Sequence, residues 1–272
     1  MFLKRISYAL GGLLATTGAA MALPLPWQTT LQPAASPVME RIESFHTMVF
    51  YIITAISLFV AALLIYIMIR FNSRSNPVPS KTEHNTLLEV LWTIVPVLIL
   101  VFIAVPSFRL LYFEAEIPKP DVVIKAIGKQ WFWSYEYPAS NFTYDSLGLS
   151  DADAARKGEP RLLGVDNIVV LPVNKVIQVE TTGADVIHSW ALPQMGVKMD
   201  AVPGRINNTW FEATKEGTYY GECSELCGAR HAYMPIEVKI VSQAEYEAWL
   251  AQAKKKYAAI DGAQPDTRVA TR

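Results

Sequence analysis

Cysteine and histidine are scarce in this chain, whose 272 residues include two cysteines and four histidines. Its charges almost cancel, with a formal net charge of -1, so no basic surface points to nucleic acid. No glycine-rich phosphate-binding loop, internal repeat or long low-complexity tract is present. Nucleic acid is therefore not an expected partner, and nothing supports nucleotide chemistry or a repeat architecture.

The few cysteines and histidines that exist are concentrated. Both cysteines, Cys223 and Cys227, lie in one short segment with His231 and Met234. Thiolates, imidazoles and thioethers are soft ligands that select copper(I), zinc or iron–sulfur clusters, and the methionine favours a copper electron-transfer site over zinc. His188 lies on a distant apolar run that reads as a strand, as in small copper β-sandwiches. Two thiolates on so short a loop can bridge a pair of metal ions.

Three other interpretations of this segment are open at this point. The two cysteines could form a disulfide in an oxidising compartment. They could join two histidines in a zinc site. They could also belong to a copper-delivery protein, in which a pair of cysteines and a remote histidine sit on a thioredoxin-like fold. His231 and Met234 fit none of the three as well as they fit a two-copper site.

The N-terminus has the pattern of an export signal. Lys4 and Arg5 precede an apolar stretch, and Ala20-Met21-Ala22 offers small residues for cleavage. We therefore expect a signal peptide at residues 1–22 and an external segment at 23–46, although an uncleaved membrane anchor is the alternative.

Two apolar spans follow, at about 48–69 and 90–111, within a transmembrane hairpin expected at 47–113, and residues 48–69 and 90–108 carry no charge. The loop between them carries more basic than acidic residues, which places it in the cytoplasm and both flanking segments outside. Two prolines, Pro96 and Pro106, fall inside the second span, where neighbouring helices can satisfy the freed carbonyls. The hairpin is expected to pack against a larger membrane partner.

An external domain is expected at residues 114–258. Short runs of β-branched and aromatic residues are separated by turn residues, which is typical of a β-sandwich. The predicted strands are 122–127, 131–137, 168–171, 176–181, 186–192, 209–213, 218–222 and 236–241. Ser242 and Glu245 form a capping box for a closing amphipathic helix that runs to about Ala258. Residues 259–272 read as a flexible tail.

The segment 130–137 is unusually aromatic. Alternation predicts that Trp131, Trp133, Tyr135 and Tyr137 share one face of a strand, where they either pack in the core or form a binding surface. Acidic residues outnumber basic ones between 130 and 185. This excess is either a solvated face or a field that steers a basic partner.

These features together resemble subunit II of the haem–copper cytochrome c oxidases. The resemblance covers nearly the whole chain from about Phe45 to Leu250. It is carried by the hairpin, by the aromatic run and by the segments 165–172, 185–190, 199–205 and 219–228. The fold it implies is a two-helix transmembrane hairpin followed by an all-β cupredoxin-like sandwich with a C-terminal helix.

The resemblance also implies a ligand set. It assigns the side chains of His188, Cys223, Cys227, His231 and Met234 to a dinuclear copper A centre with two copper ions. The backbone carbonyl of Glu225 would bind one copper, and its carboxylate would point to a magnesium ion shared with subunit I. Magnesium prefers oxygen ligands whereas copper(I) takes sulfur, so one residue can serve both metals.

Further roles follow from the same resemblance. Trp131 would receive electrons from cytochrome c, and Glu89 would lie at the mouth of a proton channel. Asp200 and Arg205 would lie at the contact with subunit I. The cytochrome c docking surface would contain four acids, namely Glu136, Asp145, Asp151 and Asp153.

The expected function is that of subunit II of a proton-translocating cytochrome c oxidase in the bacterial inner membrane, with its N-terminus and C-terminal domain in the periplasm. It would pass electrons singly to haem in subunit I and would not be catalytic alone. Subunit I, subunit III, cytochrome c and lipid are the expected partners. The chain has no Cys-x-x-Cys-His haem motif, so the donor is a separate protein. A quinol oxidase subunit would lack the cysteines, the copper domain of nitrous oxide reductase would lack the spans, and a copper chaperone would hold one ion.

Overall fold

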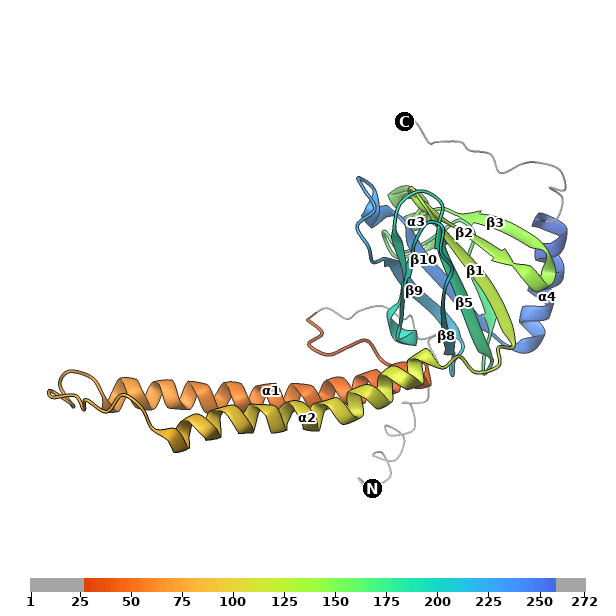
Figure 1. Ribbon diagram of the computed structural model, residues 1–272. Coiled ribbons are helices and arrows are strands. Elements are labelled where there is room, and N and C mark those ends of the chain that lie inside the picture. Colours follow the sequence, from red (N-terminus) through yellow and green to blue (C-terminus); the bar gives the residue numbers. More distant parts are fainter. Residues whose placement is uncertain (1–26, 258–272) are drawn as a thin grey trace, which may run out of the picture.

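The computed structural model describes residues 27–257 and has two parts, a long helical hairpin and a β domain at one end of it (Figure 1). The expected signal peptide at 1–22 and the expected tail at 259–272 lie outside the described residues. The fold class predicted from the sequence is confirmed: two apolar helices precede a β-sandwich with a C-terminal helix.

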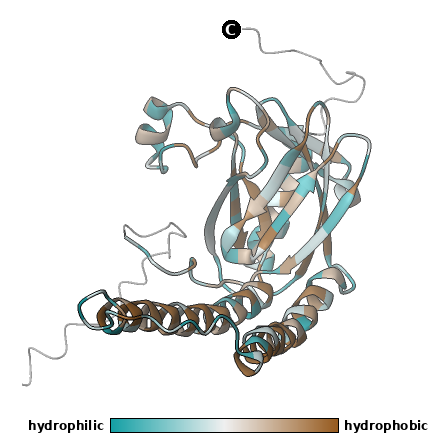
Figure 2. Cartoon of the chain, turned by 60° about the vertical axis from the view of Figure 1, so that its left-hand side comes forward, coloured by the Kyte–Doolittle hydropathy of each residue, from teal (hydrophilic) through white to brown (hydrophobic). Residues whose placement is uncertain are grey.

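The hairpin consists of α1 (Pro37–Arg70) and α2 (Thr86–Ala115). Each begins at a side-chain cap, since the Ser36 hydroxyl accepts from Met39 N and the Asn85 side chain accepts from Leu88 N. Both helices contain a window of high mean hydropathy, 2.8 and 2.6, with none of that window buried. Figure 2 shows that hydrophobic residues, drawn in brown, predominate along both of them. Helices of this length and composition that expose their apolar side chains are membrane spans.

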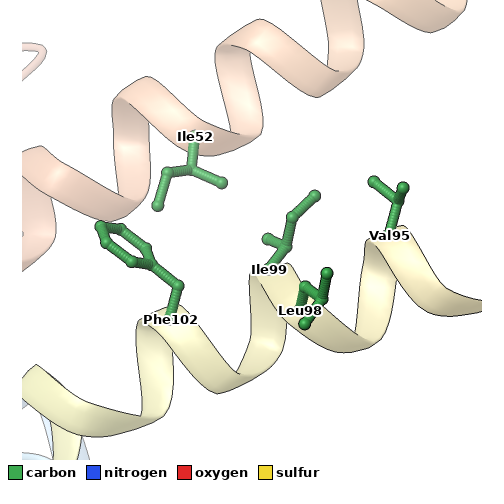
Figure 3. A pocket seen from close by; sticks show the side chains of 5 residues that line it. All are labelled: Ile52, Val95, Leu98, Ile99 and Phe102. Carbon is green, nitrogen blue, oxygen red and sulfur yellow. The ribbon is translucent and has the colours of Figure 1, made fainter.

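The two helices do not close tightly against each other. An apolar gap of about 280 Å³ separates them, lined by Ile52 of α1 and by Val95, Leu98, Ile99 and Phe102 of α2 (Figure 3). All five side chains that line this gap are apolar. The hairpin therefore leaves an apolar surface that lipid or a neighbouring helix can cover.

The β domain contains ten strands within the described residues. They are β1 (Val122–Lys129), β2 (Phe132–Tyr137), β3 (Phe142–Ser146), β4 (Val169–Pro172), β5 (Val176–Gly183), β6 (His188–Leu192), β7 (Val197–Ala201), β8 (Asn207–Glu212), β9 (Gly217–Cys223) and β10 (Pro235–Val241). They form two sheets, with strand orders β3-β2-β1-β5-β8 and β4-β10-β9-β6-β7. Three short 3-10 turns, η1 (Pro138–Ser140), η2 (Pro193–Met195) and η3 (His231–Tyr233), connect some of them.

The core lies between the two sheets and follows from alternation along the strands. On β2, Trp133, Tyr135 and Tyr137 point inward and are buried, so packing is the correct interpretation for these three. Trp131 is not on the strand: it lies half-buried in the turn between β1 and β2. The prediction that all four aromatic residues share one face was therefore wrong for Trp131.

Most predicted strands are present with small shifts at their ends, but β3, β7 and the short helix α3 (Asp151–Lys157) were not predicted. The closing helix α4 (Gln243–Tyr257) begins at the predicted capping box, in which Glu245 N donates to Ser242 Oγ and Ser242 N donates to Glu245 Oε2. Tyr257 of α4 stacks against Phe142 and Tyr144 of β3, and Trp249 packs edge-on against Phe142, which closes the edge of the first sheet.

The hairpin and the β domain meet through an ordered junction. Ser36 Oγ donates to Met195 O at 2.7 Å, Ala35 N donates to Gln194 O at 3.0 Å, and Thr214 N donates to Ala35 O at 2.9 Å. The start of α1 is therefore held by η2 and by the segment after β8.

The end of α2 is held at the same junction. Trp210 on β8 donates from Nε1 to Glu114 O at 3.2 Å, and its ring packs edge-on against Phe113. The guanidinium of Arg41 lies 3.6 Å from the centre of the Phe113 ring. Hydrogen bonds, aromatic packing and a cation–π contact thus fix the orientation of the hairpin relative to the sandwich.

Candidate metal centre

The candidate ligands come from two adjacent strands and one loop of the second sheet. His188 is the first residue of β6 and Cys223 is the last residue of β9, and these strands pair with Trp190 opposite Cys223. Cys227, His231 and Met234 lie on the loop between β9 and β10, defined here as the ligand loop (residues 224–234). In Figure 1 this loop projects from the β domain on the side toward which the hairpin extends, away from α4.

The five side chains converge. Cys223 Sγ lies 3.8 Å from His188 Nδ1, and Cys227 Sγ lies 3.5 Å from His231 Nδ1 and 3.5 Å from Met234 Sδ. The two Sγ atoms are 3.9 Å apart, and one potential ligand atom from each of His188, Cys223 and Cys227 falls within 4.8 Å of the others. His188 and Met234 have no exposed surface, and both cysteines are buried.

The disulfide interpretation does not describe this structure. Both cysteines are free, and their sulfur atoms are 3.9 Å apart, about twice the length of an S–S bond. Each sulfur instead faces an imidazole, as expected of thiolates arranged around a metal ion.

The orientation of His188 is set by two neighbours. Its Nε2 lies 2.8 Å from Asp185 Oδ1, which leaves Nδ1 directed at Cys223. Gly128 on β1 lies against the imidazole, and a Cβ at that position would meet ring carbons at 2.7 Å. Asp185 also accepts hydrogen bonds from the backbone N–H groups of Gln130 and Val186. The imidazole is therefore fixed in direction and tautomer, as metal-binding histidines usually are.

The ligand loop is tied to the turn between β1 and β2. The carbonyl oxygen of Cys227 accepts from Gln130 Nε2 at 2.8 Å and from Trp131 Nε1 at 3.2 Å. Trp131 is thus connected to the backbone of a candidate metal ligand through a single hydrogen bond.

Electrostatics at the site favour a bound cation. Burial raises the pKa of the Cys223 thiol, but hydrogen bonding to His188 and to backbone groups of Glu225 and Ser189 outweighs it, so the pKa is lowered. Burial and the neighbouring Cys223 charge raise the pKa of Cys227. Burial lowers the pKa of His188, but Cys223 and Asp185 raise it further than burial lowers it. Because the charge of Cys223 hinders the ionisation of Cys227, a cation between the two sulfur atoms would favour release of both protons.

The donor set distinguishes between metals. Two thiols and two imidazoles suit either zinc or copper, but a buried thioether at 3.5 Å from one thiol adds a soft donor that zinc sites do not use. The residues therefore fit copper, and the site is a candidate copper site of the CuA type.

The other predicted residues lie around this centre or far from it. The carbonyl oxygen of Glu225 faces the site, 3.3 Å from Cys223 Sγ. Asp200 and Arg205 are exposed beside the His188 strand, where His188 pairs with Ala201. Glu89 lies half-buried in the first turn of α2, at the opposite end of the hairpin from the β domain.

The predicted docking acids fall on two surfaces. Glu136 and Asp145 lie on the outer face of the first sheet, and Asp151 and Asp153 lie in α3. Sequence reasoning missed Asp185, Gln130 and Gly128 as parts of the site. The one signal for Asp185 was its position three residues before His188 in an apolar run.

The fold and the site define a membrane-anchored protein that carries a cupredoxin-like β-sandwich with a candidate CuA-type copper site. A family model described as "Cytochrome C oxidase subunit II, periplasmic domain" matches residues 122–241, and one described as "Cytochrome C oxidase subunit II, transmembrane domain" matches residues 24–110. The chain belongs to the cytochrome c oxidase subunit II family and is part of the oxidase complex.

Individual relatives agree with this assignment. A probable cytochrome c oxidase subunit 2 of Rickettsia bellii is 48% identical over 255 residues, which cover 93% of this chain and 94% of that protein. Cytochrome c oxidase subunit 2 of Cereibacter sphaeroides is 44% identical over 268 residues, covering 89% and 88%. The crystal structure of the periplasmic domain of subunit II of cytochrome oxidase of Bradyrhizobium japonicum is 56% identical, with a TM-score of 0.49, and covers 52% of this chain and 99% of that one.

Proposed function

We propose that this subunit accepts electrons one at a time from cytochrome c at a dinuclear copper centre and passes them to haem in subunit I, where oxygen reduction drives proton pumping. The observation that carries the proposal is the pair of free, buried cysteines, whose sulfur atoms lie 3.9 Å apart and face two imidazoles and a thioether. One thiolate would suffice for a mononuclear copper site. A second thiolate at this distance can bridge two metal ions.

In this proposal His188, Cys223, Cys227, His231 and Met234 hold the coppers, and the Glu225 carbonyl adds an oxygen ligand. A bound copper pair supplies a one-electron carrier that spreads the charge over two metals. The chain holds its ligands on β6, β9 and a loop bonded to Gln130 and Trp131, so their positions change little when the charge changes. Burial of both cysteines and of Met234 excludes water.

Trp131 is the proposed point at which electrons arrive. Its ring is half-buried in the turn between β1 and β2, and its Nε1 donates to the carbonyl of Cys227. This hydrogen bond joins the surface of the domain to the ligand loop in one step. The acids Glu136, Asp145, Asp151 and Asp153 are proposed to contribute to cytochrome c docking.

The remaining roles concern the assembly. The proposal orients the β domain toward the periplasm of a bacterial inner membrane and the loop between α1 and α2 toward the cytoplasm. Asp200 and Arg205 contact subunit I, the Glu225 carboxylate reaches a magnesium ion shared with it, and Glu89 lies at a proton channel mouth. Subunit III is a further neighbour of the complex. The long apolar faces of α1 and α2 are consistent with packing against other spans.

Metal analysis of the purified complex tests the central claim. We expect two copper ions per chain beyond those bound by subunit I, and an electron spin resonance signal in which one unpaired electron couples to two copper nuclei. Cys227→Ser removes the second bridging thiolate and should abolish this coupling. Ser224→Ala, on the same loop and without a proposed ligand role, is the matched control. A single zinc or a single uncoupled copper in the unaltered chain would refute the proposal.

A further inference from the structure

All four proposed docking acids have basic partners within the chain. None of them is a free negative charge, although a steering field for a basic protein would require uncompensated acids. The ion pairs are Glu136 with Lys125 at 3.2 Å, Asp145 with Lys129 at 3.8 Å, Asp151 with Arg161 at 3.0 Å, and Asp153 with Arg156. The four docking acids therefore contribute much less net negative charge than their number alone suggests.

Lys129 is the basic partner nearest to the proposed point of electron arrival. It is the last residue of β1, and the turn that follows it contains Trp131. Alternation along β1 buries Ala126 and Gly128 and turns Lys129 outward. Its ammonium group lies 5.2 Å from the centre of the Phe132 ring and 3.8 Å from Asp145 Oδ1. A positive charge thus sits on the outer face of the first sheet, two residues before Trp131 in the chain.

The ion pair between Lys129 and Asp145 is exposed enough to exchange partners. The side chains retain 31% and 53% of their exposed surface, and exposed pairs of this kind contribute about 0–1 kcal/mol. A lysine of an approaching protein could replace Lys129 at Asp145, but it would then meet the displaced ammonium group nearby. Lys129 therefore disfavours a strongly basic docking face in two ways. Its ammonium group already occupies Asp145, and it repels the positive charges of an approaching protein.

We propose that Lys129 is a specificity-determining residue for the electron donor, and that it selects a cytochrome whose docking face carries few positive charges. The inference rests on the proposed function, since it assumes that a cytochrome docks at Trp131. It changes the chemistry of the expected partner from a strongly basic protein to a nearly neutral one. Apolar contact with the Trp131 and Phe132 rings, rather than long-range attraction, then supplies much of the docking interaction.

A charge-matched pair of variants tests this inference in the intact complex. Lys129→Gln removes the charge beside Trp131. Lys175→Gln removes an equally paired charge, since Lys175 lies 3.6 Å from Asp121, but at the other end of β1. β1 is eight residues long, so its two ends lie about 25 Å apart, which is beyond the Debye length at physiological salt. Trp131→Ala is included to test the docking position itself.

The measurement is stopped-flow reduction of the copper centre by a strongly basic soluble cytochrome c, used both native and with its lysines acetylated. The dissociation constant for each oxidised cytochrome is measured alongside. At an ionic strength of about 0.1 M, where the Debye length is about 10 Å, we expect Lys129→Gln to accelerate reduction by the native donor about three-fold, to tighten its binding similarly and to steepen the salt dependence. Acetylated donor should react equally with both forms, and Lys175→Gln should behave like the unaltered chain.

The outcomes separate this inference from the function on which it rests. If Trp131→Ala slows reduction and Lys129→Gln leaves the native donor's rate and binding unchanged, the inference is wrong while the proposed docking position stands. If Trp131→Ala has no effect, the docking position is wrong and the inference falls with it. An equal acceleration with native and acetylated donors, or an altered copper spectrum in Lys129→Gln, would also overturn it, because Lys129 would then act on the site rather than on donor charge.

Discussion

The imidazole of His188 contacts three residues that are not themselves candidate metal ligands. Asp185 holds Nε2, Gly128 packs against the ring, and Trp133 packs edge-on with its centre 6.0 Å away. Hydrogen bonds to a carboxylate raise the basicity of a histidine ligand and fix its direction. The ligand behaviour of His188 therefore depends on residues from β1, β2 and the turn before β6.

Asp185→Asn should weaken this support without removing a ligand. An amide cannot match the negative charge of the carboxylate, so His188 becomes a poorer donor and the reduced copper centre is favoured. We expect the reduction potential to rise by about 30–100 mV and copper affinity to fall about ten-fold. Potentiometric titration of the copper absorbance measures the first effect and competition with a chelator the second.

Asp121→Asn is the matched control for this change. Asp121 also accepts a backbone N–H, from Val176, but at the far end of β1. If Asp185→Asn and Asp121→Asn shift the potential equally, the hydrogen bond to His188 does not tune the site.

Met234→Leu tests the thioether. The side chain has no exposed surface and leucine is nearly isosteric, so we expect the free energy of unfolding to change by less than about 1.5 kcal/mol. Loss of a copper donor should raise the reduction potential and slow electron transfer. Met195→Leu, at another fully buried methionine, should leave the potential unchanged. An unchanged potential in Met234→Leu would remove this residue from the ligand set.

At the residue scale, the candidate ligands could be proposed from the sequence because soft donors are rare in this chain and most of them lie close together. One short segment contains four of these soft donors, namely Cys223, Cys227, His231 and Met234. Gln130 and Gly128 could not be found this way, since their roles depend on the contact between two sheets. An amide that bonds the Cys227 carbonyl and a glycine that makes room for a ring leave no local pattern in the sequence.

At the scale of elements, residues 147–166 act as a covering segment over the outer face of β9 and β10. This segment contains α3, and Val165 N donates to Glu237 Oε2 on β10 at 2.9 Å. Tyr220 on β9 donates to Glu159 of the covering segment at 2.8 Å. Glu237 is 1% exposed, and its Oε1 has no hydrogen-bond partner among the described residues. A carboxyl group is therefore enclosed between the segment and the sheet.

Enclosure of Glu237 should make stability depend on pH. Burial, with a smaller contribution from the charge of Glu159, raises its pKa from the ordinary 4.5 to about 7, although Val165 N, Lys157 and Lys239 act in the opposite direction. Because the folded chain binds the proton more tightly, the stabilising contribution is complete below pH 4.5. It is lost as the pH rises through 7. Allowing for partial contact with solvent, we expect a loss of about 2 kcal/mol by pH 8.

Glu237→Gln should remove this dependence. The amide oxygen can still accept from Val165 N, and no charge forms at high pH. Thermal unfolding of the unaltered protein, the variant and a Glu212→Gln control is compared between pH 5 and 8. The difference between Glu237→Gln and the unaltered chain should grow with pH, and Glu212→Gln, the same substitution at the half-buried last residue of β8, is the matched comparison. A constant difference across the range would contradict the enclosure argument.

Element prediction succeeded where alternation was uninterrupted and failed where polar residues obscured it. The strands with continuous apolar or β-branched runs were predicted with their ends shifted by a few residues. β3 reads Phe-Thr-Tyr-Asp-Ser and β7 reads Val-Lys-Met-Asp-Ala, so each carries charge on its outer face. Their inward residues, such as Phe142 and Tyr144, become recognisable as core only once the partner sheet and α4 are in place.

At the scale of the whole molecule, the hairpin anchors the chain in the membrane and holds the β domain in a fixed orientation. The apolar faces of the helices were evident from the sequence, because a membrane span is defined by composition alone. The junction was not, since Ser36, Gln194 and Thr214 are ordinary polar residues until the fold brings them together. Its rigidity determines how closely the ligand loop can be held above subunit I in the proposed assembly.

Gly196 tests the rigidity of this junction. It follows η2 with a φ of +70°, and a Cβ there would meet Ile42 Cδ1 at 2.8 Å and the backbone of Met39 at 3.0 Å. Gly196→Val should therefore force the first turn of α1 away from the sandwich. Gly158→Val is the matched control, because Gly158 has a φ of +73° and nothing within 4 Å of an added Cβ. Both variants carry the same left-handed strain, so their difference isolates the clash.

Hydrogen exchange of the intact protein in detergent measures the effect. We expect the amides of Ala35, Met39 and Thr214 to exchange about ten-fold faster in Gly196→Val, corresponding to a local loss near 1.4 kcal/mol, and to be unaffected in Gly158→Val. β6 and β9, the strands that carry His188 and Cys223, should keep their protection in both variants, since they do not contact α1 through the residues whose amides are expected to change. If the α1 amides are equally protected in the two variants, the junction adapts to the added side chain at no cost in free energy. The hairpin then does not fix the position of the β domain.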